Sequence, residues 1–165
     1  MKPNAIVYTS STGFTRRYAV LLGEQTGLPV YTLTEAKKAL PAGEAIVYLG
    51  WIFASRIKEF GKAAGRFRVC ALCGVGLTPT GGRREEVRKA SKAPEDIPLF
   101  TLQGGMDRSR LRGVNKLLIS MLTKGLQGQA QRSPADEEML TLLTKDDCYV
   151  SLENLSEVLD WLRAQ

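Results

Sequence analysis

A chain of 165 residues, 44% of them apolar, is long and apolar enough to form one folded domain with an ordinary core. The formal charge is +6 and histidine is absent, which removes the commonest general base and the commonest metal ligand. Three cysteines form no disulfide framework and, without histidine, no structural zinc site, so we predict no metal site.

The apolar runs at 45–49 and 97–102 are far shorter than the roughly 20 residues that a membrane-spanning helix requires. Residues 1–4 lead directly into a strand-like run and lack the long apolar region of a signal peptide. We therefore expect a cytoplasmic protein.

Strand-like and helix-like runs alternate along the chain, which is typical of an α/β protein with a parallel sheet and helices on both faces. The run at 45–49 has no polar alternation and predicts a central strand buried on both sides. A Gly-Leu-Pro break at 27–29 ends the first helix. The predicted strands are 5–8, 30–33, 45–49, 68–73 and 98–102, and the predicted helices are 14–26, 57–64, 83–92 and 152–163.

About fifty residues separate the last predicted strand from the last helix, more than a connection needs, so we predict an insert at about 106–147. It has an apolar stripe at helical spacing, formed by Leu111, Val114, Leu118 and Met121 or Leu122, with Arg108, Arg112, Lys116 and Lys124 off that stripe. Such a helix either lies on an anionic membrane surface or packs on the core with its basic face in solvent, and we favour the second interpretation. The polar stretch 125–138 predicts a mobile loop.

Two cysteines, Cys70 and Cys73, have the C-x-x-C spacing of thiol redox pairs. Redox pairs lie at a helix N-terminus, where the helix dipole lowers a thiol pKa, whereas these two lie in a predicted strand. We interpret them as buried structural thiols.

The most informative segment is 6–19, a strand followed by a hydroxyl-rich turn and a helix. A helix N-terminus exposes unsatisfied N–H groups and a partial positive charge, so a phosphate finds donors there without a lysine. Ser10, Thr12 and Thr15 add hydroxyl groups, and Gly13 permits close backbone approach. The spacing matches neither a P-loop nor a dinucleotide-binding turn, so a terminal monophosphate fits best. The alternative is that these residues only cap the helix.

This stretch resembles the flavodoxin signature, whose constrained positions are met by Ile6, Val7, Tyr8, Ser10, Gly13, Thr15 and Ala19. The resemblance implies a single flavodoxin-like domain over 1–165, with a doubly wound five-stranded parallel sheet in the order 2-1-3-4-5. It also implies flavin mononucleotide (FMN) as the cofactor. The phosphate would be held by Ser10, Ser11, Thr12, Gly13, Phe14 and Thr15.

In doubly wound sheets the ligand lies beyond the carboxyl ends of the strands, and flavodoxins follow this rule by binding FMN where the strand order reverses, between the first and third strands. We therefore expect ring contacts after the third and fourth strands, from Trp51, Ile52, Phe53, Ala54, Gly74, Val75 and Gly76. Aromatic side chains can cover the face of a flavin ring, and glycines let the backbone approach its edge. Alternatively, the two aromatic residues pack beneath their own loop. Flavodoxins commonly have a second aromatic residue after the fourth strand, and this chain has none there.

Within the flavodoxin superfamily, an isoelectric point near 9.4 differs from the acidic electron shuttles. The chain is more similar to the menaquinone-dependent protoporphyrinogen oxidases, through the segment 98–105, the basic insert and the segment 150–155. That resemblance implies an FMN-dependent oxidoreductase that passes electrons from a small reduced substrate to a quinone. Arginines of the insert would contact substrate carboxylates or a membrane surface, namely Arg108, Arg110 and Arg112.

Two other functions stay open: an electron carrier that docks a protein partner, and a binding module that kept the fold without the flavin. Electron transfer to a flavin requires orientation more than a protein base, and the sequence identifies no catalytic side chain. The basic residues are spread along the chain and no nucleic-acid-reading motif occurs, so we expect no nucleic acid partner.

Overall fold

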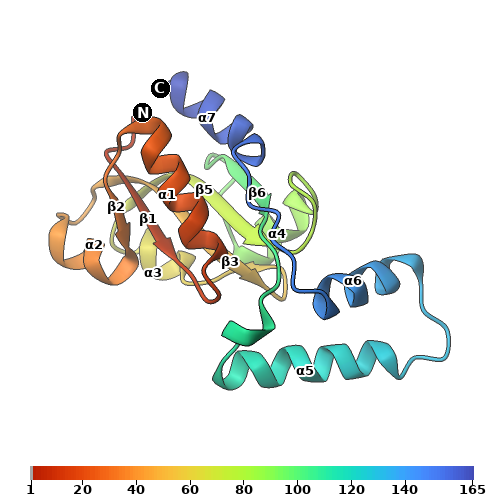
Figure 1. The fold of residues 1–165 in the computed structure, drawn as a ribbon. Helices are drawn as coiled ribbons and strands as arrows, with labels where there is room; N and C mark the ends of the chain where they lie inside the picture. The colour runs from red at the N-terminus through yellow and green to blue at the C-terminus, as the bar shows by residue number, and fades with distance from the viewer. Residues whose placement is uncertain (1) are drawn as a thin grey trace.

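The computed structural model describes residues 2–165, the side chain at position 115 excepted, and is built around a six-stranded sheet. Five strands are parallel in the order β2-β1-β3-β5-β6, and the short β4 pairs antiparallel with β3. This order confirms the predicted α/β fold with a flavodoxin-like doubly wound sheet (Figure 1). The strands are β1 Ala5–Thr9, β2 Val30–Thr32, β3 Ala45–Phe53, β4 Arg56–Ile57, β5 Arg68–Gly76 and β6 Leu99–Gln103.

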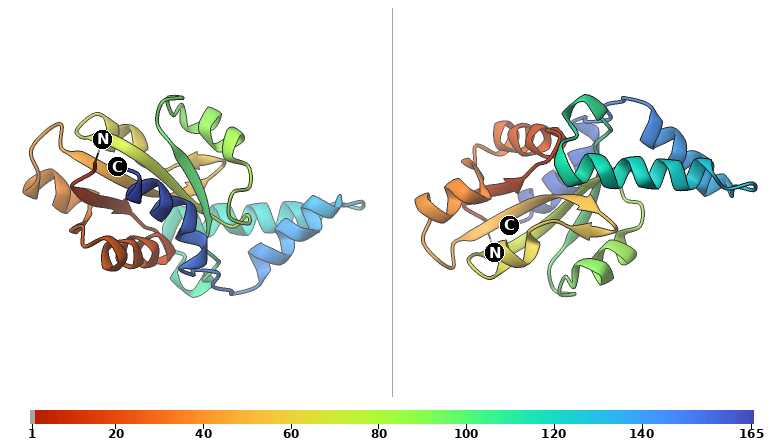
Figure 2. Two further views of the ribbon diagram at one scale, coloured as in Figure 1. Left: turned by 90° about the horizontal axis from the view of Figure 1, so that it is seen from above. Right: turned by 90° about the horizontal axis from the view of Figure 1, so that it is seen from below.

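Helices cover both faces of the sheet (Figure 2). One face packs against α1 and α7, and the other packs against α2, α3 and α4. Two further helices and two 3₁₀ turns lie between β6 and the C-terminal helix. The helices are α1 Phe14–Thr26, α2 Leu33–Ala39, α3 Phe60–Ala64, α4 Arg84–Ser91, α5 Gly113–Gln127, α6 Pro134–Thr144 and α7 Ser156–Arg163, and the 3₁₀ turns are η1 Arg108–Arg110 and η2 Glu153–Leu155.

The central strands are buried on both faces, as the absence of polar alternation in the third predicted strand indicates. In β3, Ile46 and Tyr48 point into the layer beneath α2, α3 and α4, whereas Val47 and Leu49 point into the layer beneath α1 and α7. All four side chains are fully buried. The sheet is therefore a rigid platform whose carboxyl edge presents the loops that follow β1, β3 and β5.

Several element boundaries differ from the predictions. The helix predicted over 57–64 is wrong in its first part, because Ile57 pairs with Ile52 in β4 and α3 begins only at Phe60. The sequence predicts no helix at 33–39, yet α2 forms there and begins with a capping box in which Thr32 and Glu35 satisfy each other's backbone amides. Burial of Leu33 under the sheet then holds this short helix in place.

The insert forms a helical arm beside the sheet, in which α5 and α6 lie next to each other (Figure 1). The loop predicted over 125–138 is shorter than predicted and covers 128–133, because α5 continues to Gln127 and α6 begins at Pro134. The start of α6 is fixed by a capping box between Ser133 and Asp136. Among residues 2–165, no helix has both the length and the hydropathy needed to cross a bilayer.

The apolar side chains of α5 do not all enter a core. Leu126 packs with Met106 and Leu143 in a small core within the arm, whereas Val114, Leu117 and Met121 are 70%, 61% and 62% exposed. The interpretation of the apolar stripe as a core-packing face is therefore wrong. The reason is that α5 packs chiefly on one neighbour, α6, which covers only part of its apolar circumference.

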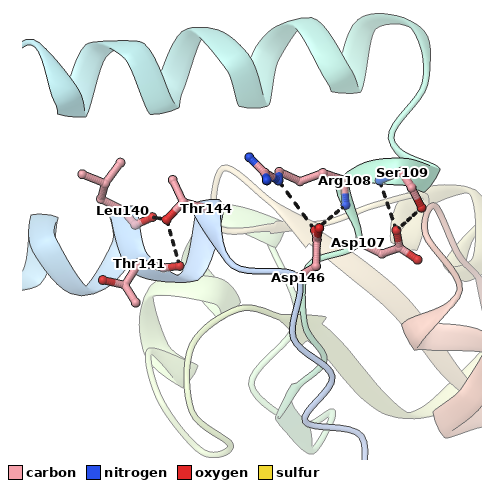
Figure 3. Close-up of polar contacts among 7 residues, drawn as sticks. All are labelled: Asp107, Arg108, Ser109, Leu140, Thr141, Thr144 and Asp146. Carbon is pink, nitrogen blue, oxygen red and sulfur yellow. Dashed lines mark hydrogen bonds and ion pairs between the residues drawn. The ribbon is translucent and has the colours of Figure 1, made fainter.

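A narrow neck joins the arm to the sheet. Gly105 and Cys148 form an isolated antiparallel bridge, in which Met106 donates its amide to Asp147 O at 3.0 Å and Tyr149 donates to Gly104 O at 2.8 Å. Beside the neck, the Arg108 amide donates to the Asp146 carboxylate at 2.9 Å, and the Asp107 carboxylate accepts from the Ser109 amide at 3.1 Å (Figure 3). These contacts fix the position of η1 near the sheet edge.

Candidate functional site

The strand register brings three segments together at the carboxyl edge of the sheet. Thr9, at the end of β1, pairs with Gly50 of β3, and Gly50 pairs with Gly74 of β5. The order of the strands reverses at β1 and β3, and the crevice at such a point is where open α/β sheets bind their ligands. The turn at 10–13, the end of β3 and the end of β5 therefore surround one site.

The turn before α1 leaves the start of that helix without a side-chain cap. Gly13 is the N-cap residue, with a left-handed φ of 102°, and its amide donates to Ser10 Oγ at 3.1 Å. Within residues 2–165, the amides of Phe14 and Thr15 donate no hydrogen bond. The hydroxyl groups of this turn do not cap the helix, so the alternative of capping alone is not what the structure shows.

A buried threonine also lies at this helix start. Thr15 is only 1% exposed and lines a small apolar cavity behind the turn. A threonine hydroxyl can both donate and accept a hydrogen bond.

The outer side of the turn borders a larger hollow of about 620 Å³, which we call the loop hollow. Its positive side chains are Arg16, Lys58 and Arg110, and its one carboxylate, Glu59, is paired with Lys62 at 2.6 Å. The hollow combines a helix start with guanidinium groups, which favours an anionic ligand. The full lining is Tyr8, Thr9, Ser10, Ser11, Thr12, Gly13, Arg16, Thr32, Leu33, Thr34, Trp51, Lys58, Glu59 and Arg110.

A buried tyrosine holds the end of β1 in position. The Tyr48 hydroxyl donates to Lys58 O at 2.8 Å and lies 2.8 Å from Thr9 Oγ1. Burial raises the pKa of Tyr48 well above the usual tyrosine range, so the phenol stays protonated and keeps donating at physiological pH. The turn that follows Thr9 therefore begins from a fixed point.

The apolar cavity has a volume of about 90 Å³ and lies between the strand ends and the arm. Most of the predicted ring-contact residues line it: Trp51, Ile52, Phe53, Val75 and Gly76. They lie within β3 and β5, which run past the predicted strand ends, and not in loops. Ser11, Thr12, Phe14 and Thr15 complete the sheet side of the cavity.

Two of the predicted ring contacts, Ala54 and Gly74, do not line this cavity. Ala54 lies in the turn to β4 and borders a separate apolar groove beneath α5. Gly74 packs against Ile52, whose Cδ1 lies 2.8 Å from the position that a Cβ on Gly74 would take. That glycine therefore makes room for a neighbouring side chain within the sheet.

The two aromatic residues of β3 are half-buried and contact each other at a ring-centroid distance of 6.0 Å. The Lys58 ammonium lies 5.6 Å from the Trp51 ring and 5.9 Å from the Phe53 ring. Trp51 borders both the apolar cavity and the loop hollow, as do Ser11 and Thr12. The two spaces are therefore neighbours with a shared wall.

The arm supplies a wall of the site that the sequence did not predict. Met106, Leu111 and Ile119 close the apolar cavity, next to Gly104 and Gly105. A Cβ on Gly104 would lie 2.8 Å from Val75 Cγ1 and 3.1 Å from Phe14 Cβ, so glycine is needed where the chain leaves β6. In the sequence, the two adjacent glycines after the last strand were the signal for this wall, because glycines mark places where the backbone passes close to neighbouring atoms.

The apolar cavity is small for an organic ligand, because pockets that bind such molecules usually measure about 300 Å³ or more. Its outer wall belongs to the arm, whose helix α5 packs chiefly against α6.

Comparisons of this chain with protein-family models, with curated proteins and with solved structures found no match.

Proposed function

We propose that this chain binds FMN at the carboxyl edge of its sheet and acts as an FMN-dependent oxidoreductase. The observation that carries the proposal is the unsatisfied start of α1, where the amides of Phe14 and Thr15 are unpaired within residues 2–165 and Gly13 adopts a left-handed conformation. A phosphate monoester supplies the acceptor oxygens that this arrangement lacks. The flavodoxin-like strand order places that helix start at the reversal point.

The residues present fit the parts of FMN. The amides of Phe14 and Thr15 and the hydroxyl groups of Ser10, Thr12 and Thr15 would hold the phosphate. Trp51 and Phe53 would cover one side of the ring, and the backbone of Val75 and Gly76 would lie along its edge. When bound, FMN supplies the ability to accept and return electrons.

The chain contributes binding, orientation and exclusion of water. The apolar side chains of Met106, Leu111 and Ile119 would cover the ring from the arm and keep water from it. Histidine is absent from the chain, and we assign no side chain as a catalytic acid or base. The chain's role is then to position the flavin between an electron donor and an acceptor.

The resemblance to menaquinone-dependent protoporphyrinogen oxidases supports a small reduced substrate as donor and a quinone as acceptor. A protoporphyrinogen carries carboxylates, and the arm presents exposed arginines beside the site. In a stopped-flow experiment, the dithionite-reduced holoprotein is mixed with a water-soluble menaquinone analogue in the absence of oxygen. We expect reoxidation at a rate that rises with quinone concentration, and reoxidation no faster than in buffer contradicts the oxidoreductase assignment.

The second candidate is an electron carrier that docks a protein partner. The exposed apolar side chains of α5 favour it, because contiguous exposed apolar surface often marks a protein contact. A carrier would bind FMN but show no turnover with small-molecule donors and acceptors. The quinone experiment therefore separates the two candidates.

Cofactor binding is tested first. Purified protein should show a flavin absorption spectrum, or should quench the fluorescence of added FMN with a saturating one-to-one titration. Gly13→Val serves as the loss-of-binding control, because a bulky side chain conflicts with the φ of 102°. Colourless protein that leaves the fluorescence of FMN unchanged contradicts the proposal.

A further inference from the structure

The arm carries an arginine to the mouth of the turn before α1. Arg110 is the last residue of η1, and its Nη1 lies 3.0 Å from the position that a Cβ on Gly13 would occupy. The two residues are 97 positions apart in the chain (110 − 13), and the neck at Gly105 and Cys148 brings them together. Arg110 also borders the loop hollow, into which the turn opens.

The guanidinium of Arg110 is held in this position by the adjacent carboxylate. Arg110 Nε lies 3.1 Å from Asp107 Oδ2, and Asp107 also accepts a hydrogen bond from the Ser109 amide at 3.1 Å. Hydrogen bonding from Ser109, together with the nearby Arg110 charge, lowers the pKa of Asp107, so the carboxylate stays ionised. Because Asp107 engages Nε, the Nη groups are left to face the turn.

Electrostatics makes this arrangement selective for a doubly charged anion. The start of α1 offers unpaired amides and a partial positive charge, which suffices for a monoanion. A phosphate monoester carries nearly two negative charges at neutral pH, and a guanidinium at its outer side compensates the second. The side chain of Arg110 is 57% exposed, so its guanidinium group can adjust to the ligand.

We propose that Arg110 is a phosphate ligand carried by the arm, so that the terminal phosphate of the cofactor is clamped between the start of α1 and η1. This inference rests on the proposed function and deepens it, because it assigns to the arm the recognition of the phosphate group. It makes the chain select FMN over riboflavin, which has the same ring and ribityl chain but no phosphate.

Arg108 provides a matched control on the same 3₁₀ turn. Its Nε lies 3.7 Å from Asp146 Oδ1, and its side chain extends toward the end of α6 and away from the turn before α1 (Figure 3). Its side-chain exposure of 55% is close to that of Arg110. Replacing either arginine by alanine removes one positive charge, yet only one of the two faces the phosphate position.

The test measures the dissociation constants of FMN and of riboflavin by flavin fluorescence quenching, for the full chain and for the variants Arg110→Ala, Arg110→Lys and Arg108→Ala. We expect Arg110→Ala to weaken FMN binding about tenfold or more, because a hydrogen bond to a charged group is lost. Riboflavin binding should stay within about twofold of wild type, since that ligand has no phosphate for Arg110 to hold. Arg108→Ala should bind both ligands as wild type does.

The lysine variant checks the role of charge. A lysine keeps the charge but not the planar fork of the guanidinium, so Arg110→Lys should bind FMN more tightly than Arg110→Ala and less tightly than wild type. Raising the ionic strength should reduce FMN affinity more in wild type than in Arg110→Ala, because salt screens this exposed charge.

Three results would overturn the inference. They are an FMN affinity unchanged in Arg110→Ala, an equal loss in Arg108→Ala, or an equal loss of FMN and riboflavin affinity in Arg110→Ala. The last result would mean that the variant disturbs the ring site or the fold, and riboflavin binding therefore also reports on folding. If the wild-type chain binds neither flavin, the proposed function fails as a whole, which is distinct from failure of the Arg110 assignment alone.

Discussion

Gly13 shows how much of the site depends on a single backbone conformation. Its φ of 102° lies in the region that side chains other than glycine rarely adopt, and it turns the chain from β1 into α1. The Nη1 atom of Arg110, on the arm, lies 3.0 Å from the position that a Cβ on Gly13 would take. Both the turn and the approach of the arginine require that this position has no Cβ.

Gly13→Ala should weaken FMN binding about tenfold or more, because the left-handed conformation is strained for alanine and the new methyl group contacts Arg110. Flavin fluorescence titration measures the loss. The control is Gly43→Ala, at a φ of 79° in an open turn with no atom within 4 Å of the added Cβ. That variant carries similar backbone strain away from the site, so it should lower stability by about 1 kcal/mol and leave FMN affinity unchanged.

The cysteines differ sharply in exposure. Cys73 is fully buried, as predicted, Cys148 is exposed, and Cys70 is half-buried at a position where the pairing of β3 with β5 shifts register. Iodoacetamide should therefore label Cys148 in the native protein at pH 8 and label Cys73 only after unfolding, because burial keeps that thiol protonated and inaccessible. Peptide mass spectrometry after labelling measures this. Equal labelling of the two in native protein would contradict the described core.

At the scale of elements, the arm is the feature that distinguishes this chain from a bare doubly wound sheet. It has its own small core, formed by Met106, Leu126 and Leu143, and its backbone joins the sheet at the bridge between Gly105 and Cys148. Elements that bury few contacts against the rest of a protein open at lower free energy than the core. We therefore expect the arm to open more readily than the sheet core.

Gly105→Ala should loosen the arm. Gly105 has a φ of 151°, and an added Cβ would lie 2.1 Å from Asp147 O, so the bridge to Cys148 cannot form unchanged. Trypsin should then cleave faster at Lys124 and Arg132, while the main thermal unfolding transition shifts little. Gly125→Ala is the control, because an added Cβ meets no atom within 4 Å and alanine favours the helix. Cleavage as slow as in wild type would show that the bridge does not hold the arm.

At the scale of the whole molecule, buried titratable groups couple the stability of the fold to pH. Burial raises the pKa of Cys73 from 9.0 to about 12 and also raises the pKa values of Tyr18 and Tyr48. Above about pH 9 the unfolded chain loses protons that the folded chain keeps, so stability falls as pH rises. Each fully buried group contributes a slope of about 1.4 kcal/mol per pH unit within its window.

Chemical denaturation between pH 8 and pH 11 should therefore give a decreasing free energy of unfolding. Cys73→Ala removes one of the coupled groups, so its slope against pH should be shallower than that of wild type, whatever the variant does to stability at pH 8. Identical slopes in wild type and Cys73→Ala would contradict the coupling.

The sheet and the position of the turn could be predicted from the sequence, because the apolar runs of β1, β3 and β5 and the hydroxyl-rich segment at 10–15 are local patterns with local physical causes. Packing in three dimensions was needed to show that Trp51 and Phe53 lie on an extended strand and that α2 begins at a capping box under the sheet. It also decided that Arg110 of the arm reaches Gly13. That contact depends on the neck and on the path of η1, and no periodicity or spacing in the chain encodes a distance between residues so far apart.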